Sequence, residues 1–160
     1  MASKDLVPGT LYQAIAEVIA QARQQVRQAV NQHMVQAYWH IGRLIVEQEQ
    51  QGQQRAEYGK QQLKQLSERL QAEFGKGFDV GNLRNMRQFY LTFPKHYTLR
   101  SVLSWSHYRT LMRIENPAAR QWYADEAADE NWSVRALERQ IGTLYYERLL
   151  ASKEKALVEH

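Results

Sequence analysis

Side chains at positions 84, 85 and 88 have the residue types that read the edges of DNA bases. Arg84 can donate two hydrogen bonds to the major-groove edge of guanine, and the amides of Asn85 and Gln88 can pair with the edge of adenine. At about 100° per residue, a helix over residues 79–93 places these three on one side and its apolar residues on the other. The apolar side consists of Leu83, Met86, Tyr90 and Phe93, with Val80 at its edge. The pattern therefore predicts a helix with a base-reading face.

Groups suited to phosphate contact flank this face. Gly81 lets the backbone approach an anion near the helix start, where free N–H groups and the helix dipole favour negative charge, and Asn82 lies in the same turn. We predict phosphate contacts from Lys60, Lys76 and Arg87, with Lys64 and Lys95 as further cations around the site. The complete predicted DNA-contacting set is Arg84, Asn85, Gln88, Arg87, Gly81, Asn82, Lys76 and Lys60.

The segment that carries these residues has the form of a helix-turn-helix motif. Helical spacing predicts a first helix over Leu63–Phe74, a turn over Gly75–Phe78 and a second helix over Asp79–Phe93. Two short helices joined by a brief turn that contains glycine define this motif. Asp79 has a suitable type for the N-cap of the second helix, and Pro94 ends it. The alternative is a surface helix with a polar outer side and no ligand.

Positive charge is concentrated in the same part of the chain, whose net charge is +4. Residues 1–59 hold five Lys/Arg and five Asp/Glu, residues 60–113 hold ten and three, and residues 114–160 hold six and nine. The three parts therefore carry net charges of 0, +7 and −3. An anionic partner would meet the middle part. From charge alone, a solvated basic face without a partner fits equally well.

The whole sequence predicts an all-α fold. Apolar residues recur at helical spacing, and 8 Gly and 3 Pro in 160 residues are too few for a turn-rich β-sandwich or barrel. An N-terminal stripe runs from Leu11 to Ile45, either as one helix to about Gln50 or with a break near Asn31. This stripe either packs on the domain or pairs with a second chain. The Gln-rich stretch Glu47–Arg55 is predicted to be a loop.

Capping residues mark three later helices. The first is expected to start at Ser104 or Ser106 and to end at Ile114. The second is expected to start at Asn116-Pro117 and to end at about Glu130. The third is expected to start at Ser133, and the chain ends in the charged helical stretch Ser152–His160. The last helix is predicted to turn Val134, Leu137, Ile141 and Leu144 inward. At helical spacing, Trp39, Trp122, Tyr123 and Trp132 are expected in the core rather than as base-stacking platforms.

Composition removes several classes of site. The chain has no Cys, which excludes disulfide scaffolds, Cys-based zinc sites, iron–sulfur clusters and thiol catalysis. No pair among the five His has the i, i+4 spacing of a helical metal site, and Gly75-Lys76-Gly77 lacks the spacing of a phosphate-binding P-loop. We expect no cofactor and no metal. No apolar run approaches the ~20 residues of a membrane helix, and no signal core is present, so we expect a cytoplasmic protein without membrane contact.

Six separated motifs carry a family resemblance. They are Tyr38–Arg43, Glu57–Lys60, Gly75–Phe78, Asn82–Tyr90, Leu103–Tyr108 and Trp132–Glu138. Together, over about residues 11–150, they resemble the N-terminal domain of the bacterial YhcG family. The resemblance implies a helix-turn-helix, DNA-binding-like module that precedes a C-terminal nuclease domain of the PD-(D/E)xK type. No PD…(D/E)xK arrangement occurs in these residues, so no nuclease residue is carried over.

A weaker similarity points to the same architecture. Leu103–Leu111 and Trp132–Glu138 resemble the helical segment that follows the helix-turn-helix in ParB-type partition proteins. Trp105 and Tyr108 replace the small residues that are usual there, so no ligand or DNA site is carried over. The similarity favours a multi-helix DNA-binding body over a bare coiled coil.

These observations predict four segments. Residues 1–10 form a flexible N-terminus, 11–55 a helical arm for packing or dimerisation, 56–150 the helix-turn-helix domain, and 151–160 the start of a linker to an absent C-terminal domain. The expected function is to bind duplex DNA and target a nuclease, with the protein's own nuclease domain and a second copy in a homodimer as further partners. The chain alone is not expected to be an enzyme. The alternative is a protein-interaction or oligomerisation module, which requires Arg84 and Gln88 to be packed under the N-terminal helices.

Overall fold

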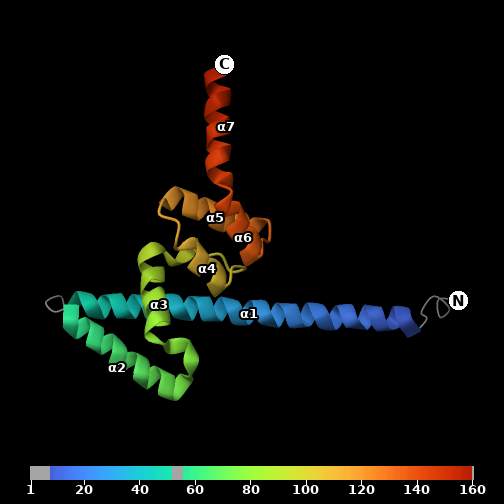
Figure 1. Cartoon of the computed structure of the whole chain (residues 1–160). Helices are drawn as coiled ribbons and strands as arrows, with labels where there is room; N and C mark the ends of the chain where they lie inside the picture. Colours follow the sequence, from blue (N-terminus) through green and yellow to red (C-terminus); the bar gives the residue numbers. More distant parts are fainter. Residues whose placement is uncertain (1–7, 52–55, 160) are drawn as a thin grey trace.

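The computed structural model describes residues 8–51 and 56–159. In this part of the chain all regular elements are helical and no strand occurs, which confirms the all-α prediction. The α-helices are α1 (Pro8–Gln51), α2 (Ala56–Phe74), α3 (Val80–Thr92), α4 (Trp105–Leu111), α5 (Pro117–Asp129), α6 (Val134–Gly142) and α7 (Tyr145–Glu159). Two short 3₁₀ segments, η2 (Lys76–Phe78) and η3 (His96–Thr98), precede and follow α3. Figure 1 shows α1 as a long rod that α3 crosses, with α4–α6 on one side of it and α7 pointing away.

α1 is one continuous helix of 44 residues, so the break considered near Asn31 does not occur. Its two halves have different surroundings. Residues 9–31 are exposed except for the half-buried Ala16. The second half enters the core through Val35, Tyr38, Trp39 and Ile45. The packing boundary therefore lies within α1 and does not coincide with the predicted segment boundary at residue 55.

α1 and α3 meet backbone to backbone. At Gly42 a Cβ atom would overlap the carbonyl oxygen of Met86 and would lie 2.8 Å from its carbonyl carbon and 3.2 Å from the Cβ of Tyr90. Glycine allows this approach because it has no side chain. Beside the crossing, the indole N–H of Trp39 donates a 2.7 Å hydrogen bond to the carbonyl of Phe93. These contacts set the position of α3 on α1.

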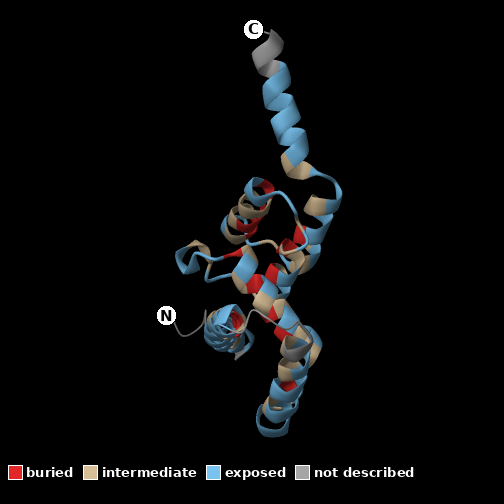
Figure 2. Cartoon of the chain, turned by 90° about the vertical axis from the view of Figure 1, so that its left-hand side faces the viewer, coloured by how far each residue is buried: buried red, intermediate tan, exposed pale blue. Residues whose placement is uncertain are grey.

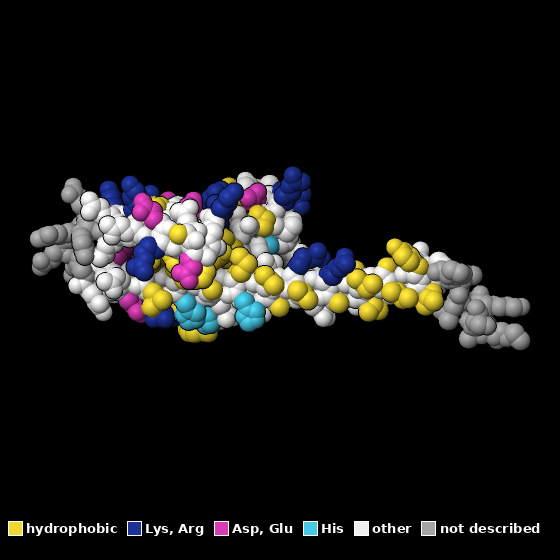
Figure 3. Space-filling view, turned by 90° about the horizontal axis from the view of Figure 1, so that it is seen from below, with side chains coloured by type: hydrophobic (Ala, Val, Ile, Leu, Met, Phe, Trp, Pro, Cys, Tyr) yellow, Lys and Arg dark blue, Asp and Glu magenta, His cyan; other side chains and the backbone are white. Residues whose placement is uncertain are grey.

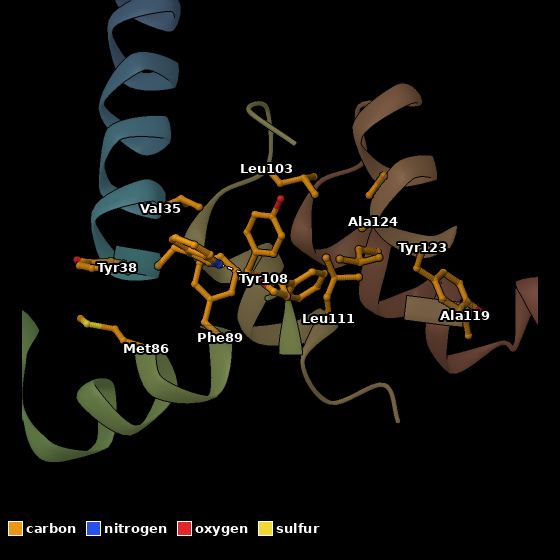
Figure 4. Close-up of a cluster of buried hydrophobic side chains, with 14 of the residues drawn as sticks. Val35, Tyr38, Met86, Phe89, Leu103, Tyr108, Leu111, Ala119, Tyr123 and Ala124 are labelled. Carbon is orange, nitrogen blue, oxygen red and sulfur yellow. Dashed lines mark hydrogen bonds between the residues drawn. The ribbon is translucent and has the colours of Figure 1, made fainter. Parts of the chain in front are cut away.

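The core is continuous from α1 to α5. Figure 4 shows its side chains in one row, from Val35 and Tyr38 of α1 through Met86 and Phe89 of α3 to α4 and α5. Aromatic rings join the layers: the centroid of Phe89 lies 4.9 Å from that of Tyr108 and 5.2 Å from that of Trp105. In Figure 2 the buried residues gather where these helices meet. Burial of large aromatic surfaces is the main source of stability at such a junction.

Four predicted helix starts are confirmed by their caps. Asp79 accepts a hydrogen bond from the N–H of Asn82, and Ser104 forms a reciprocal capping box with His107. Asn116 accepts from two N–H groups of α5, with Pro117 in the first turn, and Ser133 accepts from the N–H of Ala136. Of the two serines considered for α4, the structure selects Ser104.

Some predicted bounds are wrong. The stretch predicted as a loop is helical from Glu47 to Gln51, because α1 continues, and residues 52–55 lie outside the described part. α4 ends at Leu111 rather than Ile114. The last predicted helix is two helices, since Leu144 adopts a left-handed φ of 57° between α6 and α7. Leu137 is fully buried as predicted, but Leu144 is 56% exposed, because the chain turns before α6 could bury it.

The C-terminal helices are held to the body by polar anchors. The guanidinium of Arg100 pairs with Asp125 at 3.1 Å and Asp129 at 2.6 Å, and these carboxylates raise the pKa of Arg100. The hydroxyl of Tyr123 donates to Glu147 of α7 at 2.9 Å. Tyr123 is buried as predicted, and Trp122 lies half-buried against Tyr145. Among the described residues, no helix is both long and apolar enough to cross a membrane.

Candidate nucleic-acid interface

The outer side of α3 is polar and open, as the helical phase predicts. Arg84 and Gln88 are exposed and Asn85 is half-buried. The inner side of α3 buries Leu83, Met86 and Phe89 completely. Tyr90, predicted inside, is only half-buried, since Phe89 takes the central core position. The two side chains whose burial would favour a purely protein-binding role are therefore in solvent.

Arg84 has no counter-ion in the described ranges, where no carboxylate lies within 4.0 Å of its guanidinium. Its five N–H donors can therefore turn to an external acceptor, and a planar guanidinium suits bidentate recognition. The amide of Gln88 donates a 3.1 Å hydrogen bond to the hydroxyl of Thr92 one turn later. That bond is exposed, so water or a ligand can compete for it.

Side chains of α2 hold the turn before α3 in place through hydrogen bonds. Gly75 has a φ of 96°, which glycine adopts without strain, and it leads into η2. The hydroxyl of Ser67, 1% exposed, donates a 2.7 Å hydrogen bond to the carbonyl of Phe78. The amide of Gln71 donates to the same hydroxyl at 2.7 Å. α2 thereby fixes the point at which α3 begins.

Asn82 joins three elements instead of pointing freely outward. Its amide donates a 2.6 Å hydrogen bond to the carbonyl of Gly77, and its oxygen accepts a 3.1 Å bond from the indole N–H of Trp105. The side chain thus ties η2 and α4 to the first turn of α3. As placed here, its hydrogen-bonding groups serve the domain itself.

Arg87 also has an internal partner. Its Nε donates to both carboxylate oxygens of Glu49, at 2.7 and 3.0 Å. The pair links α3 to the end of α1, and both side chains are about two-fifths exposed. A solvent-exposed pair of this kind contributes little to stability, on the order of 0–1 kcal/mol. Its main effect is to hold the guanidinium of Arg87 against the body rather than over the outer side of α3.

Of the two lysines predicted to contact phosphates, Lys76 lies in η2 directly before α3 and is exposed, as is Gly81 at the start of α3. Lys60 is also exposed but lies near the start of α2, about 21 Å along that helix from its end at Phe74. A Cβ added at Gly81 would meet only a carboxylate oxygen of Asp79, at 3.6 Å, so this turn is open to approach. α2 also exposes Glu68 and Glu73, so its surface carries both signs of charge. The positive character is stronger in η2 and α3 than in α2.

No other cluster in the described residues has the geometry of a reactive site. No group of three or more His, Asp or Glu side chains there could hold a metal ion. His40 and His96 lie together, with ring centroids 5.3 Å apart, but they pack beside Trp39. His107 is a capping residue, and its Nε2 lies 2.8 Å from the carbonyl of Trp132. Burial raises the pKa of Tyr108 to about 12, which keeps that hydroxyl protonated and structural.

Three residues that organise the interface were absent from the sequence-based set. Glu49 was assigned to a predicted loop, so its pairing with α3 was not expected. Ser67 has no sequence signal that separates it from the polar residues around it. Gly42 did carry a signal, because a glycine inside a helical pattern often marks close backbone approach.

The geometry defines a helical domain in which a short turn leads into α3, and α3 exposes Arg84 and Gln88 on its outer side. The chain belongs to the family of DUF1016 N-terminal domains, whose profile matches residues 14–148. It is 36% identical over 178 aligned residues, 91% of this chain, to the Escherichia coli (strain K12) protein named "Putative nuclease YhcG". The chain spans about half the length of that relative, 48%. No solved structure matches.

Proposed function

We propose that this chain is a DNA-binding domain that targets a nuclease domain of the same protein to duplex DNA. α3 would enter the major groove, with Arg84, Asn85 and Gln88 at base edges. Lys60 and Lys76 would contact phosphates around it. The proposal rests on the exposed guanidinium of Arg84, which has no carboxylate partner among the described residues and lies at the centre of an outward helix face, next to a glycine-containing turn.

The internal partners of two residues refine the roles within the predicted set. Asn82 and Arg87 are proposed to hold α3 in place, through Trp105 and Glu49, rather than to read bases. Gly81 is proposed to admit a phosphate at the first turn, to the backbone N–H groups of Val80 and Gly81, since the N–H of Asn82 already donates to the carboxylate of Asp79. In this proposal, base contacts come mainly from Arg84 and Gln88, which are one helical turn apart on α3.

The relative supports the proposal at the level of the whole protein. Its name describes a nuclease, and it is about twice as long as this chain. A nuclease needs a way to engage nucleic acid, and this chain aligns with about half of that relative. We propose that the catalytic part is a separate C-terminal domain of the PD-(D/E)xK type and that this chain by itself has no enzymatic activity. A cytoplasmic location and DNA as the substrate belong to the same proposal.

The proposal is tested by fluorescence anisotropy with this chain and labelled duplex DNA at several salt concentrations. Affinity should fall log-linearly with salt, because bound cations displace counterions from phosphates. Lys76→Ala should weaken binding to all sequences alike and lower the salt slope by about one. Absence of binding near ~50 mM salt would overturn the proposal.

Base reading requires a second comparison with a preferred sequence selected from a random pool. Arg84→Ala should weaken binding to that sequence by about 1–3 kcal/mol and reduce discrimination against other sequences. Arg148→Ala is the matched control, since Arg148 is an exposed arginine on α7, which points away from α3 (Figure 1). Equal losses for the two variants would show that Arg84 acts only through net charge.

A further inference from the structure

The first half of α1 packs against no other element of the described part of the chain. Residues 9–31 are exposed apart from the half-buried Ala16, and core contacts begin near Val35. A stretch of this length extends about 35 Å at 1.5 Å per residue. Isolated helices in water are marginal, because most helical stability in proteins comes from packing of an apolar face. We refer to residues 9–31 as the arm.

The arm carries an apolar stripe with an 11-residue repeat. The repeated pairs are Leu11 and Ala22, Ile15 and Val26, Val18 and Ala29, and Ile19 and Val30. A repeat of 11 residues corresponds to about 3.67 residues per turn, close to the natural helix, so the stripe runs nearly straight along one side. The charged residues of the arm are Glu17, Arg23 and Arg27, and at about 100° per residue they lie beside or opposite the stripe.

The stripe does not end with the arm. Leu44 is 56% exposed and lies 18 residues, or five turns, after Val26, so both face the same side of α1. Leu44 is also at the edge of an apolar groove of about 250 Å³ between α1 and α2, which Ile41, Ile45, Leu63, Leu66 and Leu70 line. Figure 3 views this side and shows hydrophobic side chains that follow α1 from the arm toward the globular part. An apolar ridge and an apolar groove thus share one face of one helix.

We propose that two copies of this chain pair through antiparallel α1 helices, with the arm of each in the α1–α2 groove of the other. The middle of the arm, near Val18, and the groove residue Leu44 are 26 residues apart along α1. A two-fold axis near residue 31 therefore places Val18 of each copy opposite Leu44 of the other and fills both grooves at once. Such a contact is isologous and closes at two subunits. Parallel pairing would cover the arms but leave both grooves empty.

The available area is sufficient for a stable dimer. The apolar residues on this face are between 47% and 73% exposed: Leu11, Tyr12, Ile15, Val18, Ile19, Val26, Val30 and Leu44. At roughly 80 Å² each, two copies would bury about 1,300 Å², and stable specific interfaces bury about 1,200–2,000 Å². The groove residues of α2 add to this sum. The inference does not depend on DNA binding, and its failure would leave the function proposed above untouched.

The first test is the mass of the chain in solution by light scattering after gel filtration. A dimer has twice the monomer mass of 18.8 kDa, about 38 kDa. Val18→Glu and Leu44→Glu should each weaken dimerisation at least tenfold, since each places a charge in the apolar contact. Leu149→Glu, at an exposed leucine of α7, should leave the mass unchanged. Thermal melting followed by Trp fluorescence checks that each variant retains its core. A monomeric parent chain at all concentrations up to the millimolar range would overturn the proposal.

The second test determines the direction of pairing. Because the chain has no cysteine, Val18→Cys and Leu44→Cys each introduce a single thiol. With a short bismaleimide, an equimolar mixture of the two variants should cross-link, whereas Val18→Cys alone should not. In the antiparallel dimer the two Val18 positions are separated by about 26 residues of rise, or ~39 Å. Efficient cross-linking of Val18→Cys alone, with no product in the mixture that joins a Val18→Cys copy to a Leu44→Cys copy, would establish parallel arms and refute the groove contact.

Discussion

Replacement of Gly42 by alanine should be among the most damaging single-methyl changes in this domain. The new Cβ would overlap the carbonyl oxygen of Met86 and approach its carbonyl carbon to 2.8 Å, where carbon atoms normally rest about 3.5–4.0 Å apart. The obstacle is the backbone of α3, which cannot rotate away as a side chain would. α1 and α3 must therefore separate by a sizeable fraction of an ångström, and the packing around Trp39 and Phe89 is disturbed with them.

The expected cost follows from known overpacking effects. Extra methyl groups in filled cores cost about 1–3 kcal/mol and occasionally more, and a backbone obstacle places Gly42→Ala at about 3 kcal/mol. For a domain of this size, 1 kcal/mol shifts the melting temperature by about 2–4 °C, so a decrease of roughly 6–12 °C is expected. Differential scanning calorimetry measures it directly.

Gly142→Ala is the matched control. Gly142 is also helical, but a Cβ there would meet no atom within 4 Å. Alanine at an unobstructed helical position is neutral or stabilising by up to about 1 kcal/mol relative to glycine. If Gly42→Ala melts within 2 °C of the parent, the close crossing of α1 and α3 does not exist in solution.

Three smaller perturbations test other parts of the interface. Ser67→Ala leaves the carbonyl that ends η2 without its buried donor and should cost about 1–3 kcal/mol in denaturant unfolding; an unchanged midpoint would mean that the turn is held otherwise. Burial raises the pKa of Tyr108 to about 12, so its contribution to stability is complete below the unfolded pKa near 10 and is lost between about pH 10 and 12. The melting temperature of Tyr108→Phe should therefore fall less steeply than that of the parent over this pH range. Equal slopes would show that Tyr108 does not have this raised pKa. Glu49→Gln removes the counter-ion of Arg87 and should tighten DNA binding, measured by anisotropy at low salt. The free energy of unfolding should change by less than about 1 kcal/mol. Unchanged affinity would show that Arg87 stays away from the DNA.

Local signals predicted the elements of the fold well. Capping residues such as Asp79, Asn116 and Ser133 act on backbone groups two or three positions away, so their effect is visible in the sequence. The side of α3 that faces the core was likewise predictable from the spacing of its apolar residues. The predicted loop over Glu47–Arg55 was wrong in its first part, because glutamine-rich composition does not by itself end a helix.

Long-range pairings were beyond the sequence. The partner of Arg87 is 38 residues away, and Asn82 accepts from Trp105 across 23 residues. Both contacts depend on how α1 and α4 are placed around α3, which spacing along one helix cannot reveal. The left-handed backbone at Leu144 was also unexpected, since leucine has no preference for that conformation. For Arg87 and Asn82, the sequence could not show that their hydrogen-bonding groups already have partners inside the domain.

The division of α1 into an exposed half and a packed half makes one helix behave as two cooperative units. Backbone amides near Val35 and Ile45 lie under core side chains, so their hydrogen exchange requires the whole domain to open. In the monomer, amides of the same helix near Leu11 and Val18 are protected only by local hydrogen bonds, which fray without disturbing the core. Deuterium uptake by the monomer should therefore change steeply along a single uninterrupted helix, with the transition just before residue 35. In that state the arm can melt and re-form many times during one lifetime of the native core, and pairing of two copies should slow its exchange.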